Sequence, residues 1–136
     1  MKQRIVLFNV DSNQKKIHFL CETVKMHFEK KEPLLLFVSD DKGLTYVDEL
    51  LWKVPEESFI PHIISAKETE EKIVITKLRE NLNQAKYVFN LCPTPILQTK
   101  FTIIYDFDDK TSPHKRMLSQ KRFEAYKNAK WVIESR

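Results

Sequence analysis

Apolar residues in this chain fall into short uninterrupted runs, separated by longer segments with helical periodicity. The runs predict buried β-strands, because strands covered on both faces of a parallel sheet read as continuous apolar stretches. They are residues 4–10 (RIVLFNV), 34–39 (LLLFVS), 73–76 (IVIT), 87–91 (YVFNL) and 101–107 (FTIIYDF). Residues 59–64 (FIPHII) are expected to be extended as well.

The segment after the first run predicts a helix that Asp11 or Ser12 can cap. Its apolar residues recur at helical spacing and form one stripe. They are Ile17, Leu20, Cys21, Val24 and Phe28. A long helix between two apolar strands is typical of a right-handed βαβ unit on a parallel sheet.

Two further helices are predicted from their end signals. Ser39 and Asp40 open the second, and Pro55 stops it. The last has Ser112 at the N-cap and Pro113 at its first position, and is predicted to run to about Trp131. We expect the face of this helix that docks on the sheet to hold Leu118, Ala125 and Ala129, with Tyr126 nearby. Residues 77–84 are predicted to form a polar loop or a short helix.

These elements predict a single α/β domain over residues 1–136, with a mostly parallel central sheet and helices on both faces. Gly43 is the only glycine. A dinucleotide fingerprint needs several glycines in one turn, and a P-loop needs two glycines and a lysine, so both are excluded. The expected fold is therefore Rossmann-like without a glycine-rich phosphate loop.

Charge is distributed unevenly along the chain. Residues 110–136 hold eight Lys or Arg and two Glu, a net charge of +6, and the remainder has a net charge of −2. We expect an acidic partner at the C-terminal segment, either nucleic acid or an acidic peptide. No apolar run approaches the ~18 residues that cross a bilayer, and the first run is too short for a signal peptide, so a cytoplasmic location is expected.

Groups that could carry chemistry are few. Cys92, with His62 or His114 as its base, is a weak candidate nucleophile, and Cys21 and Cys92 are expected to be buried reduced thiols. His18, Cys21 and His27 make one weak metal cluster, whereas zinc usually takes four ligands. Asp106, Asp108 and Asp109 suit Mg²⁺ or a solvated turn, and the turn is favoured. We therefore predict no catalytic residue, metal or cofactor.

Two groups of side chains are better candidates for binding another protein. Trp52 and Phe59 stand at the two ends of a loop that contains Pro55 and precedes Pro61, where large aromatics can anchor a partner. Their alternative role is core packing. On the last helix, Arg116, Gln120, Phe123 and Lys127 share one face, which suits an apolar acidic peptide or stacked nucleotides. The alternative is that Phe123 joins the core and the cations are simply solvated.

The segment VDELLWKVPEESFIPH (47–62) resembles a motif of the chi subunit of bacterial DNA polymerase III holoenzyme. Supporting similarities are LCE at 20–22 followed by Phe28, LLLFVSDDK at 34–42, and LSQKRFEAYKNAKW at 118–131. The resemblance implies a non-catalytic subunit with an α/β fold like that of nucleotide-binding domains. It places a contact to the clamp loader, through the psi subunit, on Trp52 and Phe59.

The same resemblance implies a second contact, with the acidic and apolar C-terminal tail of single-stranded DNA-binding protein. It maps this contact to Arg116, Gln120, Phe123 and Glu124, with Asp108 near it. The family has a cation at the position of Gln120 and a lysine at that of Glu124, and Lys121 and Lys127 are the cations that can compensate.

These observations favour an accessory replication protein that links single-stranded DNA-binding protein to the clamp loader. Two alternatives remain. One is a direct binder of single-stranded nucleic acid that uses residues 110–136. The other is a degenerate nucleotide-binding enzyme.

Overall fold

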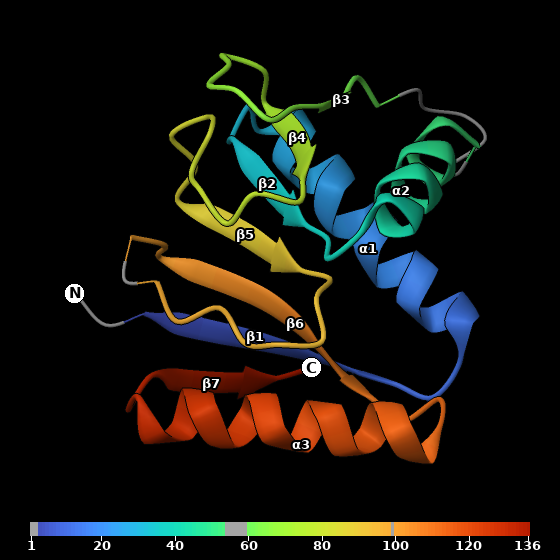
Figure 1. The fold of residues 1–136 in the computed structure, drawn as a ribbon, viewed down its shortest axis with the longest axis vertical. Coiled ribbons are helices and arrows are strands. Elements are labelled where there is room, and N and C mark those ends of the chain that lie inside the picture. The colour runs from blue at the N-terminus through green and yellow to red at the C-terminus, as the bar shows by residue number, and fades with distance from the viewer. Residues whose placement is uncertain (1–2, 54–59, 99) are drawn as a thin grey trace.

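A computed structural model describes residues 3–53, 60–98 and 100–136. Within these ranges an open sheet of seven parallel strands is combined with three helices (Figure 1). In chain order the elements are β1 (Arg4–Val10), α1 (Asn13–Glu29), β2 (Leu34–Phe37), α2 (Asp41–Lys53), β3 (Ile63–Ile64), β4 (Ile73–Thr76), β5 (Tyr87–Asn90), β6 (Ile103–Asp109), α3 (Pro113–Asn128) and β7 (Val132–Ser135). The predicted α/β class is confirmed, and the strand order is β3-β4-β2-β5-β6-β1-β7.

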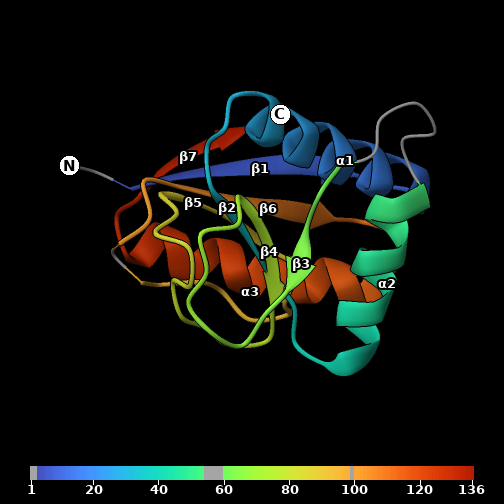
Figure 2. The same cartoon turned by 90° about the horizontal axis from the view of Figure 1, so that it is seen from above.

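Helices cover both faces of the sheet. The core on one face joins β1 and β2 to α1 and α2, through residues such as Phe8, Val24 and Leu51. The core on the other face joins the sheet to α3 and to the loops after β4 and β5, through residues such as Phe101 and Tyr126. Figure 2 shows α1 and α3 on opposite sides of the sheet. Because all strands are parallel, their carboxyl ends meet along one edge of these layers.

The helix starts follow the predicted caps. Ser12 precedes α1 and accepts a hydrogen bond from the Lys15 amide, and Ser112 does the same for Lys115 at the start of α3. The segment 77–84 contains no helix, so the loop alternative holds there. None of the three helices in the described ranges combines the length and apolar character that crossing a bilayer requires.

The end of α3 differs from the prediction. The helix stops at Asn128, and Lys130 adopts a left-handed conformation with φ of 62°. The chain then turns into β7, which the sequence reasoning missed and which pairs in parallel with β1. The predicted extension to Trp131 is therefore wrong. The sequence did not indicate this helix end, because a lysine occupies the position after the C-cap where a glycine usually marks it.

The buried face of α3 was predicted correctly only for Tyr126. It consists of Ser119, Arg122 and Tyr126, whereas Leu118 and Ala125 are half-buried and Ala129 is exposed. Polar residues occupy this face because β6 presents a buried carboxylate, that of Asp106, directly beneath it. The three aspartates of this region accordingly belong to β6 itself and do not form the solvated turn that the sequence favoured.

Candidate protein-interaction surfaces

Trp52 lies near the C-terminal end of α2 with 48% of its surface exposed. Its indole N–H donates to Asp48 Oδ1, one helical turn earlier, at 3.2 Å. The centroid of the indole is 4.6 Å from that of the His62 ring. One side of a large aromatic is thus supported by the protein, while much of the side chain faces outward.

His62 fixes this arrangement from the following segment. Its ring is buried, and Nδ1 donates to the Ile60 carbonyl at 2.7 Å, since a carbonyl oxygen can only accept. Nε2 lies 2.9 Å from Asp48 Oδ1, the same oxygen that receives the indole N–H. Asp48 therefore connects α2, Trp52 and the chain before β3 in one polar cluster.

The other predicted residues of this surface are only partly described. Pro61 is exposed next to His62. Pro55 and Phe59 lie outside the described residues. Sequence reasoning did not single out Asp48, although its spacing of four residues from Trp52 in a helix was the available signal. His62 was considered as a base for Cys92 and as the last residue of the family motif, and its contacts with Ile60 and Asp48 place its ring beside Trp52.

On α3, the four residues predicted to bind the acidic tail divide by exposure. Arg116, Gln120 and Lys127 are exposed, whereas Phe123 is half-buried and packs against the core on the α3 side of the sheet. Gln120 and Phe123 line a hollow of about 160 Å³ together with Leu7 and Asp108 of the neighbouring strands. The structure thus brings Gln120, Phe123 and Asp108 together. Arg116 and Lys127 do not line this hollow, and Glu124 is exposed close by in the helix.

Beneath this surface lies a buried polar network centred on Asp106. Its Oδ2 accepts hydrogen bonds from the Tyr126 hydroxyl at 2.6 Å, from Arg122 Nε at 3.2 Å and from Asn90 at 3.2 Å. Burial raises the pKa of the Asp106 carboxyl, and the Arg122 guanidinium and Tyr126 hydroxyl oppose that rise. Burial, together with the Asp106 carboxylate, raises the pKa of Tyr126. The network holds α3 on β6.

This network changes the charge that a partner would meet. Arg122 is buried and its charge is paired with that of Asp106, although its side chain also lines the hollow beside Phe123. The other seven basic residues of the segment 110–136 are exposed. The C-terminal segment therefore keeps a strongly basic outer surface.

Burial makes the two cysteines poor candidates for a nucleophile. Both cysteines are buried and reduced, as predicted. Burial raises the pKa of the Cys21 thiol to about 11 and also raises that of Cys92, so neither forms a reactive thiolate readily. Within the part of the chain that the structure describes, no group of three or more His, Cys, Asp or Glu side chains is placed to hold a metal ion.

An open parallel sheet with helices on both faces defines a doubly wound α/β protein. This chain is a member of that class without a glycine-rich turn. The family model of the DNA polymerase III chi subunit, HolC, matches residues 3–134, so the chain belongs to this family. No curated protein matches the chain. Membership supports an accessory role in replication, as a subunit of the DNA polymerase III complex.

Proposed function

We propose that this protein links single-stranded DNA-binding protein to the clamp loader of DNA polymerase III, and that it acts by binding and not by turnover. Its first contact is with the psi subunit or another clamp-loader component, through Trp52 together with Phe59, Pro55 and Pro61. The observation that carries this proposal is the half-exposed indole held by Asp48 and His62. A large aromatic already fixed in place loses little conformational freedom on binding.

The second proposed contact is with the C-terminal tail of single-stranded DNA-binding protein. It uses Arg116, Gln120, Phe123 and Lys127. Support comes from the hollow beside Phe123, which can take an apolar side chain, and from the exposed cations of α3, which attract a negative peptide.

Tethering explains how weak contacts of this kind can be useful. A protein that binds two partners raises the local concentration of one near the other, and so strengthens the assembly without new bonds. We place both contacts on one domain, residues 1–136. As a replication subunit, the protein is expected to work in the cytoplasm.

The first contact is tested by titrating the full chain against reconstituted clamp loader, with and without psi, in a calorimeter. We expect Trp52→Ala to weaken binding by about 2 kcal/mol or more while leaving cooperative melting intact. Leu97→Ala is the matched control, since Leu97 is an apolar residue with 50% exposure in the loop after β5. Equal affinity for wild type and Trp52→Ala would reject the contact, and loss of cooperative melting would show that the indole is needed for folding.

Asp48→Asn tests whether the indole must be held in place. We expect it to weaken partner binding less than Trp52→Ala does, because the ring remains but its anchor to His62 is weakened. Unchanged binding would mean that Asp48 has no positioning role.

Direct binding of single-stranded DNA is the second candidate, and the seven exposed basic residues of segment 110–136 favour it. Such binding would weaken steeply as salt rises, because bound cations release counterions from phosphates. Titration of an oligonucleotide and of the tail peptide at two salt concentrations separates the candidates. Tight DNA binding without peptide binding would favour the second.

A further inference from the structure

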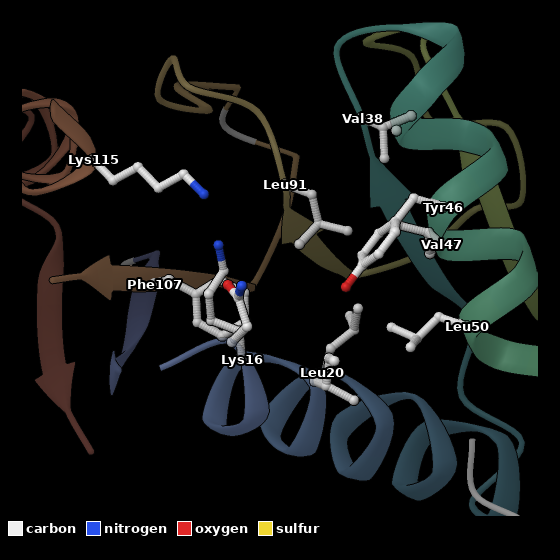
Figure 3. Close-up of a pocket in the computed structure, with 12 residues that line it drawn as sticks. Lys16, Leu20, Val38, Tyr46, Val47, Leu50, Leu91, Phe107 and Lys115 are labelled. Carbon is white, nitrogen blue, oxygen red and sulfur yellow. The ribbon is translucent and has the colours of Figure 1, made fainter. Parts of the chain in front are cut away.

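A crevice of about 360 Å³ lies outside the carboxyl ends of the central strands, between the helices (Figure 3). Val38 follows β2, Leu91 follows β5, and Phe107 belongs to β6. Residues from all three helices complete the walls. None of the residues proposed above to bind psi or the acidic tail lines this crevice, so it is a separate feature of the molecule.

The position of the crevice is the one where doubly wound proteins bind ligands. β2 and β5 are neighbours in the sheet, and the chain leaves them toward opposite faces. After β2 it enters α2, on the same face as α1, and after β5 it enters the loop that packs on the α3 side. This divergence opens a gap between neighbouring strand ends, which is a topological switch point.

The two ends of the crevice differ in chemistry. Apolar side chains of α1 and α2 line one end, and the hydroxyl of Tyr46 points into it (Figure 3). At the other end the amines of Lys16 and Lys115 approach from α1 and α3. Lys16 Nζ lies 5.9 Å from the centre of the Phe107 ring, so the cationic end also has an aromatic floor. A ligand that matches this surface has an anionic head and a flat, largely apolar body.

The charges at the cationic end are only partly neutralised. Lys16 Nζ pairs with Asp109 Oδ2 at 2.8 Å, but Asp109 also accepts hydrogen bonds from the amide and hydroxyl of Thr111. Burial acts to raise the pKa of Asp109, but the bonds from Lys16 and Thr111 outweigh it and hold the pKa below the usual range. Lys115 makes no ion pair with any residue in ranges 3–53, 60–98 and 100–136. One full positive charge and part of a second therefore face the crevice, near the first turns of α1 and α3, where helix dipoles add positive potential.

We propose that this crevice binds a nucleoside monophosphate, with the phosphate between Lys16 and Lys115 and the base at the apolar end beside Tyr46. Two ammonium groups favour a doubly charged phosphate over a singly charged carboxylate. The volume lies at the small end of the range for ligand pockets, which suits one nucleotide and not a dinucleotide. Lysine side chains take the place of the glycine-rich loop that the sequence lacks. The site does not depend on the proposed links to psi or to the acidic tail.

The same chemistry has two sources, a free nucleotide and the 5′-phosphorylated end of single-stranded DNA. The test titrates the full chain with dAMP, deoxyadenosine and inorganic phosphate, and follows amide shifts by two-dimensional NMR. We expect dAMP to bind with a dissociation constant of about 1 mM or lower. It should shift the amides of Tyr46, Leu91 and Lys115, and deoxyadenosine should bind at least about tenfold more weakly because it lacks the charged phosphate. A 5′-phosphorylated oligonucleotide compared with its unphosphorylated form then identifies the source.

Two variants and a matched control locate the site. Lys115→Ala should weaken dAMP binding about tenfold or more, and Tyr46→Ala should weaken it by a smaller factor. Both side chains are exposed, so both variants should fold. Lys121→Ala, an exposed lysine of the same helix that does not line the crevice, should leave binding unchanged.

Several results would overturn the proposal. They are the absence of shifts at the crevice with millimolar dAMP, equal weakening by Lys115→Ala and Lys121→Ala, and displacement of dAMP by an acidic peptide that binds the crevice more tightly. Oligonucleotide binding that is the same with and without a 5′-phosphate, and insensitive to Lys115→Ala, would also reject it in favour of a diffuse basic surface.

Discussion

At the scale of single residues, Arg122 is the side chain whose role the structure changes most. In the sequence it is one of several cations of a basic helix. The structure buries it against Asp106, with further bonds to the Phe107 carbonyl and the Ser119 hydroxyl. The sequence contained one signal for this, the spacing of four residues between Arg122 and Tyr126. That signal remained ambiguous because the buried acceptor lies sixteen residues earlier, on a strand.

Truncation of Arg122 should therefore destabilise the protein strongly. Arg122→Ala leaves the Asp106 carboxylate buried without its cation, which typically costs about 3–5 kcal/mol. Urea unfolding measures the loss. Lys121→Ala, next to it but exposed, should change the free energy of unfolding by less than about 0.5 kcal/mol. A similar effect of the two substitutions would mean that the ion pair contributes little to the fold.

The buried side chain of His27 should make the free energy of unfolding depend on pH. Its ring is buried between α1 and the sheet, with Nε2 2.8 Å from the Tyr105 hydroxyl, and burial lowers its pKa below the ordinary 6.5. The unfolded chain then binds a proton more readily than the native one. Stability should be greatest above about pH 6.5 and fall as the pH drops through the window below it.

The measurement compares unfolding free energies between pH 7.5 and 5 for wild type and His27→Gln. The wild type should lose more stability across this window, because only it must keep a buried imidazole neutral. The carboxyl groups with shifted pKa values, such as Asp106 and Asp109, are present in both proteins and cancel in the comparison. Parallel curves for the two proteins would show that His27 does not titrate differently on folding.

At the scale of elements, the sequence predicted correctly the helix starts and the strands that local residue patterns determine. The two serine caps, Pro113 and the five main apolar runs define the starts of α1 and α3 and the main strands, which the structure confirms. The end of α3 and the whole of β7 depend on tertiary pairing with β1, and the short segment Val132–Ser135 has no strong strand pattern of its own. Of the candidate binding residues, Trp52 was identified by its place near a helix end, but the contacts of Asp48 and His62 required the fold.

The missed strand gives a prediction for the C-terminus. Ending the chain after Lys130 removes β7 and Trp131, whose ring stacks on Tyr126 with centroids 5.9 Å apart. It also exposes the hydrogen-bonding edge of β1, which is an aggregation hazard. We expect a loss of about 3 kcal/mol or more, since the half-buried Trp131 and Ile133 each lose part of their burial energy along with the strand pairing.

Urea unfolding and size-exclusion chromatography measure these two effects separately. Val132→Ala is the control, because this variant keeps the strand. Val132 is 44% exposed, so shortening its side chain should lower the free energy of unfolding only slightly. If the shortened chain were as stable and as monodisperse as the full one, β7 would be dispensable.

At the scale of the whole molecule, the two proposed contacts occupy different layers. Trp52 is carried by α2, which packs on one face of the sheet, and the acidic-tail residues lie on α3, which packs on the other. The two helices lie well apart in Figure 1. This separation allows two partners to be held at once, which a tether requires. Clamp-loader binding and tail binding should therefore be non-competitive, and competition between the two in a calorimetric titration would contradict this arrangement.

Because the surface of α3 is basic, Glu124 is the position at which a charge change best tests binding of the acidic tail. It is an exposed acid among exposed cations, in the turn of α3 that carries Gln120 and Phe123. Replacing it by lysine removes a repulsion and adds an attraction, so Glu124→Lys should tighten binding of the acidic tail peptide several-fold at low salt and make the affinity fall more steeply as salt is added. Fluorescence anisotropy at two ionic strengths measures both effects.

Glu68→Lys makes the same charge change on an exposed residue of the loop between β3 and β4, and it controls for net charge alone. If Glu68→Lys tightened binding as much as Glu124→Lys does, the tail would be responding to the overall charge of the molecule; if neither changed the affinity, the tail would bind away from α3.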